Sequence, residues 1–172
     1  MPDILADMRS WKGKPGALND RLIGMVTKDP SLVDAVFEAL EAGNDKEKGV
    51  CLEVLEAVTR EHPDRASDRL AVIIKLIDHK APKVRWESSR IVANLACKFP
   101  TGAAAAIPAL LANTSDKGTV VRWSAAFALG EIMKHNMKER KALLSRIEAI
   151  LKREQNSGVR NVYLKAIKSI GK

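Results

Sequence analysis

The chain has 172 residues, of which 46% are hydrophobic and only 4% aromatic, and its formal net charge is +8. No apolar run approaches the roughly 20 residues needed to span a bilayer, and two cysteines are too few for a disulfide framework. These features exclude a membrane-spanning protein and a disulfide-stabilised secreted domain. Because Met1–Trp11 has neither the basic start nor the apolar stretch of a secretory signal, we expect a cytoplasmic protein.

Helical periodicity, interrupted by proline, glycine and asparagine, divides the chain into five pairs of predicted helices, the first pair shortened. In chain order the predicted pairs are Asp3–Ser10 with Ala17–Lys28, Ser31–Ala42 with Asp45–Glu61, Arg65–His79 with Pro82–Lys98, Gly102–Asn113 with Thr119–His135, and Met137–Glu154 with Gly158–Ile170. Asn44 followed by Glu47 predicts a capping box, and Pro82 suits a first helical turn, where its missing N–H costs no hydrogen bond. The fold class is therefore predicted to be all-α.

The helix pairs also repeat in sequence. Lys83–Trp86 matches Val120–Trp123 at a spacing of 37 residues, and Gly158–Arg160 continues the match 38 residues later. A basic residue thus recurs once in each of four successive units, at Lys48, Arg85, Arg122 and Arg160. Repeats of this period indicate a solenoid. We predict a single domain over residues 1–172, with units at roughly 1–29, 30–63, 64–100, 101–135 and 136–172.

The fourth unit resembles a known family. Its second helix, VRWSAAFALGEI over Val121–Ile132, resembles the second-helix signature of HEAT repeats, and the preceding helix matches the first-helix signature in Pro108 and Asp116. The resemblance implies a right-handed α–α superhelix, a HEAT-like solenoid of about five helix pairs. It further implies a structural ladder that bridges neighbouring units, made of Lys48, Arg85, Arg122, Arg160, Asp78 and Asp116.

In HEAT repeats the second helices line a concave surface, and the positions that the signature leaves unspecified face solvent. In the fourth unit these are Trp123, Phe127 and Glu131, and in the third unit they are the residues Trp86, Arg90 and Asn94. Because the chain is so poor in aromatic residues, we expect these six residues to bind a protein or peptide partner. Arg90 is expected to lie over an aromatic face. Two alternatives stay open: both tryptophans could pack between helices, or the patch could mediate homo-oligomerisation.

The positive charge is concentrated at one end of the chain. Lys134–Lys172 holds eleven Lys or Arg and three Glu, while the first 133 residues balance to zero. Asn161, Lys165 and Lys168 of the last helix could therefore contact nucleic acid or an acidic protein. The alternative is that the lysines of this end only keep a terminal repeat soluble.

Catalytic motifs are not found in the sequence. The histidines and cysteines lack metal-ligand spacing, and no phosphate-binding glycine loop occurs, so no metal, cofactor or enzymatic activity is expected. Glu53 and Glu56 are expected to be a solvated pair. Cys51 and Cys97 are both expected to be buried thiols. HEAT-like DNA glycosylases of the alkylation-repair class share the tryptophans and basic charge, but Arg90 and Phe127 stand where a carboxylate would be needed. The chain is therefore predicted to be a non-catalytic scaffold or adaptor, with nucleic-acid binding as the alternative.

Overall fold

The computed structural model describes residues 2–171, so Met1 and Lys172 of the predicted domain lie outside the described part. The helices are α1 (Ile4–Ser10), α2 (Pro15–Lys28), α3 (Leu32–Ala42), α4 (Asp45–Glu61), the 3₁₀ helix η1 (Pro63–Arg69), α5 (Leu70–Leu76), α6 (Pro82–Leu95), α7 (Pro100–Ala104), α8 (Ile107–Asn113), α9 (Thr119–His135), α10 (Met137–Leu151) and α11 (Ser157–Ile170). No strand occurs among these residues, and the predicted all-α class is confirmed.

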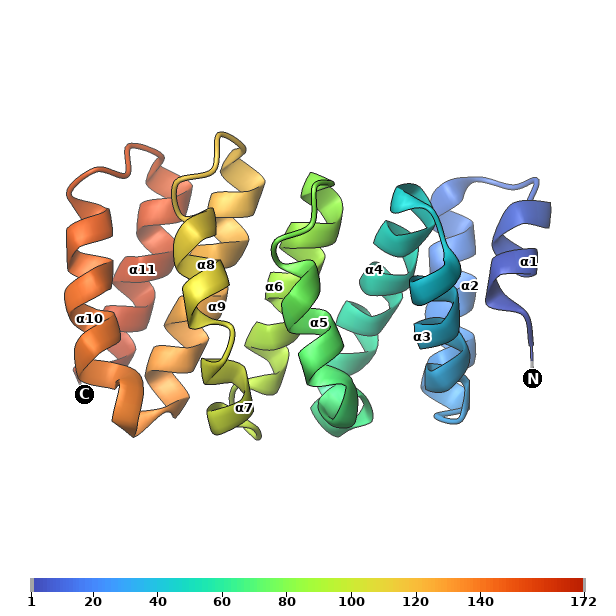
Figure 1. Cartoon of the computed structure of the whole chain (residues 1–172), viewed down its shortest axis with the longest axis horizontal. Helices are drawn as coiled ribbons and strands as arrows, with labels where there is room; N and C mark the ends of the chain where they lie inside the picture. The colour runs from blue at the N-terminus through green and yellow to red at the C-terminus, as the bar shows by residue number, and fades with distance from the viewer. Residues whose placement is uncertain (1, 172) are drawn as a thin grey trace.

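The helices form two layers along one axis (Figure 1). α3, α5, α8 and α10 form the front layer of this view, and the second helices α4, α6, α9 and α11 lie behind them. Each second helix contacts the next one along the row, so that α4, α6, α9 and α11 form a continuous stack. No helix within residues 2–171 is long and apolar enough to cross a membrane.

Local chemistry explains several helix boundaries. In the predicted capping box, the backbone N–H of Glu47 donates to Asn44 Oδ1 at 3.0 Å, and the Asn44 N–H donates to Glu47 Oε2 at 2.8 Å. Pro82 occupies the first turn of α6, as predicted. Because α6 ends at Leu95, three residues earlier than expected, Cys97 lies in the following turn and is exposed rather than buried.

Two first helices are divided where the prediction has one continuous helix, and the first helix of the last pair ends at Leu151, three residues before the predicted Glu154. The segment expected to be one helix over Arg65–His79 begins as the 3₁₀ helix η1 and continues as the short α5. The segment expected over Gly102–Asn113 is divided into α7 and α8. Pro108 in the first turn of α8 has no N–H to donate to the carbonyl of Ala104, so an unbroken helix would lose a hydrogen bond there.

The core of the stack is made of small and aliphatic side chains on the second helices. Representative fully buried positions are Leu52, Leu55, Val84, Ile91, Ala125, Leu129 and Ile132. Ser88 and Ser89, which replace the two alanines of the repeat signature, are also fully buried. Their hydroxyls donate to the carbonyls of Val84 and Arg85 at 2.7 and 2.9 Å, so that neither polar group is left unpaired inside the stack.

The ladder of basic residues has a more varied set of contacts than expected. Arg85 donates to Asp116 at 2.6 Å and Arg122 donates to Glu154 at 2.9 Å, and each pair joins neighbouring repeats. Glu154 stands 38 residues after Asp116, but it was not among the expected ladder residues.

The two outer members of the ladder bind carbonyls instead. Lys48 donates to the carbonyls of Leu40 and Glu41 at 2.7 and 3.0 Å, and Arg160 donates to those of Leu151 and Glu154. Asp78 is exposed and has no ion pair within residues 2–171. The single ammonium of Lys48 is already held by the end of α3, so Asp78 does not bridge repeats as expected.

Candidate partner-binding face

The second helices leave one side of the stack uncovered. All six residues predicted to bind a partner are at least partly exposed there: Trp86, Arg90, Asn94, Trp123, Phe127 and Glu131. We call the surface formed by these six residues, together with Lys165 of α11, the open face. The residues of α9 and those of α6 have different surroundings, which divide the open face into two parts.

The α9 part carries an aromatic pair. Trp123 and Phe127 lie one turn apart, with ring centroids 5.5 Å from each other and ring planes inclined by 25°. Stacking of this kind is favourable for aromatic side chains. Trp123 is 36% exposed, so the pair presents an apolar surface to solvent although Phe127 also packs against the core.

A groove of about 260 Å³ runs beside this pair, between α9 and α11. Its floor includes Gly130 and Ala166, and its α11 side includes Val162 and Lys165. The helices approach closely here because residue 130 has no side chain: a Cβ at Gly130 would lie 2.9 Å from Ala166 Cβ. The groove therefore depends on a glycine that the repeat signature supplies.

Charged groups line one end of the groove. Glu131 forms an ion pair with Lys134, and its second oxygen lies 3.5 Å from His135 Nε2. Lys165 is exposed and has no ion pair with any residue of the described range 2–171. The groove thus combines an aromatic wall with one cation that no carboxylate neutralises.

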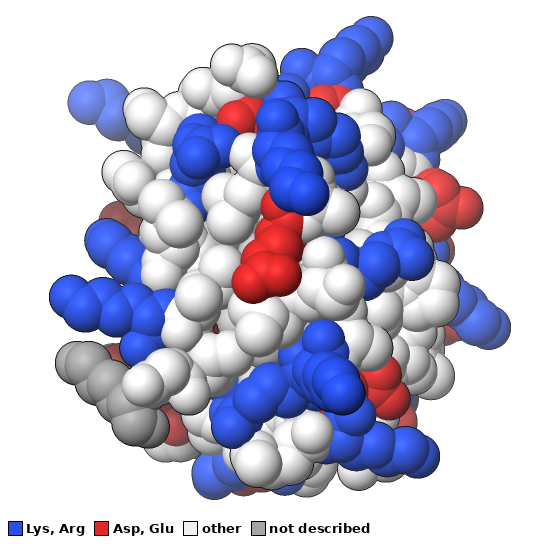
Figure 2. All heavy atoms as spheres, turned by 90° about the vertical axis from the view of Figure 1, so that its left-hand side faces the viewer, with Lys and Arg blue, Asp and Glu red and all other residues white. Residues whose placement is uncertain are grey.

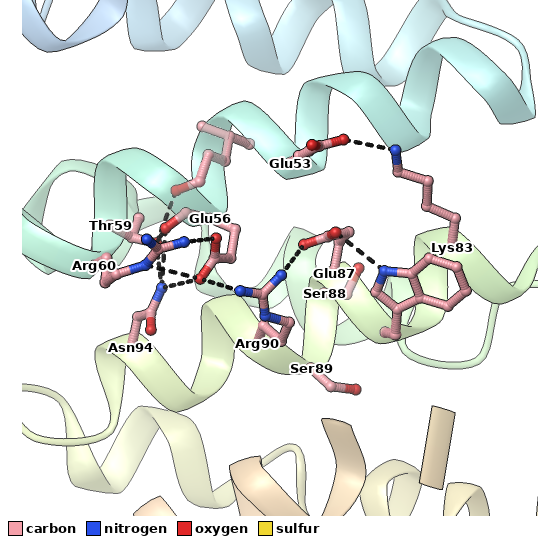
Figure 3. Close-up of polar contacts among 12 residues, drawn as sticks. Glu53, Glu56, Thr59, Arg60, Lys83, Glu87, Ser88, Ser89, Arg90 and Asn94 are labelled. Atoms are coloured by element: carbon pink, nitrogen blue, oxygen red, sulfur yellow. Dashed lines mark hydrogen bonds and ion pairs between the residues drawn. The ribbon is translucent and has the colours of Figure 1, made fainter. Parts of the chain in front are cut away.

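The α6 part of the open face is a polar network rather than an apolar patch (Figure 3). Arg90 lies between two carboxylates, 3.1 Å from Glu56 on α4 and 3.3 Å from Glu87 on its own helix. The indole N–H of Trp86 donates to Glu87 Oε1 at 3.0 Å. Asn94 donates to the backbone carbonyl of Glu56 at 3.0 Å. Two of the predicted binding residues, Arg90 and Asn94, thus also connect α6 to α4, whereas the hydrogen bond of Trp86 stays within α6.

This network corrects two expectations. Arg90 does not stack on an aromatic ring, because the two carboxylates hold its guanidinium; within residues 2–171 the cation–π contact is that of Arg69 over Phe37 at 5.5 Å. Glu56 is not solvated, since its side chain is only 4% exposed and it accepts a 2.6 Å hydrogen bond from Arg60. Glu53 does not pair with it but binds Lys83 at 2.6 Å.

Glu87 is buried within the network, with a side chain that is only 5% exposed. Burial raises the pKa of its carboxyl above the ordinary value, although the charge of Arg90 and the hydrogen bond from Trp86 act in the opposite direction. Sequence reasoning missed both buried carboxylates. A signal was present for Glu56, because the repeat spacing aligns it with Ala93 and Gly130, which are small residues buried at the seam between helices.

The basic C-terminal end is shown in Figure 2, where Lys and Arg form separate groups around uncharged surface and a central acidic side chain. Asn161, Lys165 and Lys168 are all exposed on α11, but only Lys165 lines the groove. Three arginines of this end bind the protein itself through carbonyl oxygens: Arg140, Arg153 and Arg160. Part of the positive charge therefore stabilises the last repeat instead of facing a partner.

The described residues 2–171 contain no group of three or more His, Cys, Asp or Glu side chains placed to hold a metal ion. No protein-family model matches the chain, and no curated protein sequence matches it. Solved structures do match.

A designed armadillo repeat protein in complex with the peptide (KR)4 is 16% identical with a TM-score of 0.73, covering 97% of this chain and 80% of that one. A chain from the complex of CpcE and CpcF of phycocyanin lyase from Nostoc sp. PCC7120 is 20% identical with a TM-score of 0.72, covering 95% of this chain and 95% of that one. An engineered protein is 18% identical with a TM-score of 0.74, covering 99% of this chain and 81% of that one. The fold is an armadillo/HEAT-like repeat solenoid. This confirms the predicted fold class.

Proposed function

We propose that the chain is a non-catalytic scaffold that binds a protein or peptide segment on its open face, with Trp123 and Phe127 as the anchor. The observation that carries the proposal is a stacked, partly exposed aromatic pair beside a groove, in a chain with only 4% aromatic residues. Tryptophan dominates binding energy at protein interfaces, because it buries a large area for little loss of side-chain freedom.

Two further observations support this proposal. The helix that carries the aromatic pair, α9, packs against α6 on one side and α11 on the other, and Arg90 joins α6 to Glu56 of α4, so the aromatic pair stands on a packed row of helices. Among the structural neighbours, a designed armadillo protein is described in complex with a peptide, and CpcE in complex with CpcF. Solenoids of this kind offer an extended surface on which a chain segment can lie.

The test is a selection of binding peptides from a random dodecapeptide library on the immobilised chain, followed by affinity measurement on the selected peptides. Trp123→Ala and Phe127→Ala should each weaken binding about thirtyfold, as expected for interface anchors. Leu164→Ala is the matched control, because Leu164 is an equally apolar side chain, 46% exposed on α11 and outside the groove.

Thermal unfolding of each variant shows whether the fold is kept, and sedimentation of the unliganded chain shows whether the aromatic pair instead joins two copies. Peptides that bind Trp123→Ala as tightly as the unaltered chain would contradict the proposal.

A second candidate function is binding to nucleic acid through the C-terminal end. It is favoured by exposed lysines of α10, of the turn after it and of α11 that form no ion pair within residues 2–171, among them Lys138, Lys152 and Lys168. Affinity for a DNA or RNA duplex would then fall steeply with salt, because each neutralised phosphate releases counterions. Binding to a selected peptide anchored by Trp123 should change little over the same salt range.

A further inference from the structure

The two halves of the open face differ in whether their charges are already neutralised. On α4 and α6, Glu53 binds Lys83, and Arg90 lies between Glu56 and Glu87. A cationic side chain arriving there would have to displace an arginine or lysine of the protein. This half of the open face therefore has no vacant carboxylate for a basic partner.

The groove between α9 and α11 has the opposite character. Its only carboxylate, Glu131, is held by Lys134 and faces His135, while Lys165 has no ion pair within residues 2–171. An anionic side chain of a partner could therefore form an ion pair with Lys165 without displacing a carboxylate of this chain. The charge of the groove thus favours an acidic residue of a partner over a basic one.

The size and lining of the groove indicate which apolar side chain of a partner could occupy it. At about 260 Å³ it is below the range of sites that enclose a drug-sized molecule, roughly 300–1,000 Å³, and suits one large side chain. Its apolar surfaces come from Trp123, Phe127, Val162 and Ala166, which offer no strong hydrogen-bonding group inside the groove apart from the indole N–H. A bulky apolar side chain is the complementary occupant.

We propose that the groove selects a short acidic-hydrophobic peptide motif, in which a large apolar side chain packs against Trp123 and Phe127 and an adjacent carboxylate binds Lys165. This proposal rests on the proposed function and names the chemistry of its partner. The specificity is polar as well as apolar: a basic residue beside the apolar anchor would be repelled by Lys165 and would find no free carboxylate on the open face.

The experiment is the random dodecapeptide selection carried out in parallel on the unaltered chain, on Lys165→Glu and on Lys141→Glu. Lys141 is an exposed lysine of α10 outside the groove, so its variant has the same net charge as Lys165→Glu. The unaltered chain and Lys141→Glu should enrich peptides with Asp or Glu beside Phe, Leu or Trp. Lys165→Glu should enrich Lys or Arg beside the same apolar residues, and should bind the acidic peptides about five- to tenfold more weakly.

The outcomes separate the two proposals. Selected peptides that depend on Trp123 but carry no acidic residue, or that bind Lys165→Glu undiminished, overturn the acidic motif and leave the proposed function standing. A selection that yields no peptide sensitive to Trp123→Ala overturns both.

Discussion

Gly130 of α9 and Ala166 of α11 lie so close together that a Cβ atom built on Gly130 would be 2.9 Å from Ala166 Cβ. This is inside van der Waals contact, and the Ala166 methyl is fixed directly to the backbone, so it can move away only if α11 moves. The same two residues lie in the groove of the open face. The close approach of these helices therefore connects the stability of the stack to the shape of the proposed binding site.

Gly130→Ala should destabilise the chain. Alanine gains about 1 kcal/mol over glycine inside a helix, but overpacking a tight contact costs about 1–3 kcal/mol. We expect a net loss of about 1 kcal/mol in the free energy of unfolding, measured by urea denaturation. Adding Ala166→Gly should remove the methyl group with which the new Cβ overlaps, and so give a favourable coupling energy between the two substitutions in a double-mutant cycle.

Gly24→Ala is the matched control, because Gly24 lies inside α2 and a Cβ there would meet no atom within 4 Å. That variant should be more stable by about 0.5–1 kcal/mol. If Gly130→Ala proved as stabilising as Gly24→Ala, the helices would be further apart than the structure places them.

Much of the fold could be predicted because the repeat signature encodes the second helices directly. The bounds of α4 and α9 agree with the prediction to the residue, since Asn44 caps the first and the Val-Arg pair of the repeat lies in the first turn of the second. The first helices were harder to predict. Whether Pro108 sits inside a kinked helix or starts a new one depends on how α7 and α8 pack, which a local pattern does not contain.

Some features of the candidate site could be predicted from the sequence and others could not. The spacing of Trp123, Phe127 and Glu131 was enough to place them on one open stripe, because a helix fixes which residues share a face. The burial of Glu56 and Glu87 could not be read from their own helices. It arises from contacts between α4 and α6, and only comparison of Glu56 with Ala93 and Gly130 across the repeat indicates a seam position.

Arg90→Met should cost far more stability than Lys83→Met. Removing the Arg90 guanidinium leaves Glu87, whose side chain is 5% exposed, without its cation, while the 4% exposed Glu56 keeps its ion pair with Arg60. Uncompensated buried charge is strongly unfavourable, so we expect a loss of about 2–4 kcal/mol in urea denaturation.

The control pair, Lys83 and Glu53, is 41% and 35% exposed, and Lys83→Met should cost about 0.2–1 kcal/mol. Equal losses in the two variants would mean that the Glu56–Arg90–Glu87 network does not connect α4 to α6 more strongly than a surface pair does.

Glu154→Gln should destabilise the chain at neutral pH and cease to do so in acid. Burial alone would raise the pKa of Glu154, but hydrogen bonds from Arg122 and from the Asn156 backbone outweigh it and hold the pKa below 4.5, the ordinary value. The unfolded chain therefore binds a proton first as the pH falls, and the stabilisation by ionised Glu154 is lost from about pH 4.5 downward. At pH 7 we expect Glu154→Gln to cost about 1–3 kcal/mol, a difference that narrows below pH 4.5.

Glu87→Gln should show the opposite pH dependence. The pKa of Glu87 is raised by burial, so the folded chain binds its proton more tightly than the unfolded chain does. The stability contributed by this group is present below the ordinary pKa of 4.5 and is lost as the pH rises through the higher folded value. Unaltered Glu87 should therefore gain stability relative to glutamine as the pH is lowered from 7 toward 4.5. Glutamine has one acceptor oxygen, so it can accept from Trp86 or from Arg90 but not from both through separate oxygens as the carboxylate does; this loss does not vary with pH, so the change of the stability difference with pH is the quantity to compare. Urea denaturation of both chains across this range decides the matter: a stability difference that stays constant with pH would show that Glu87 is solvated as an ordinary surface carboxylate.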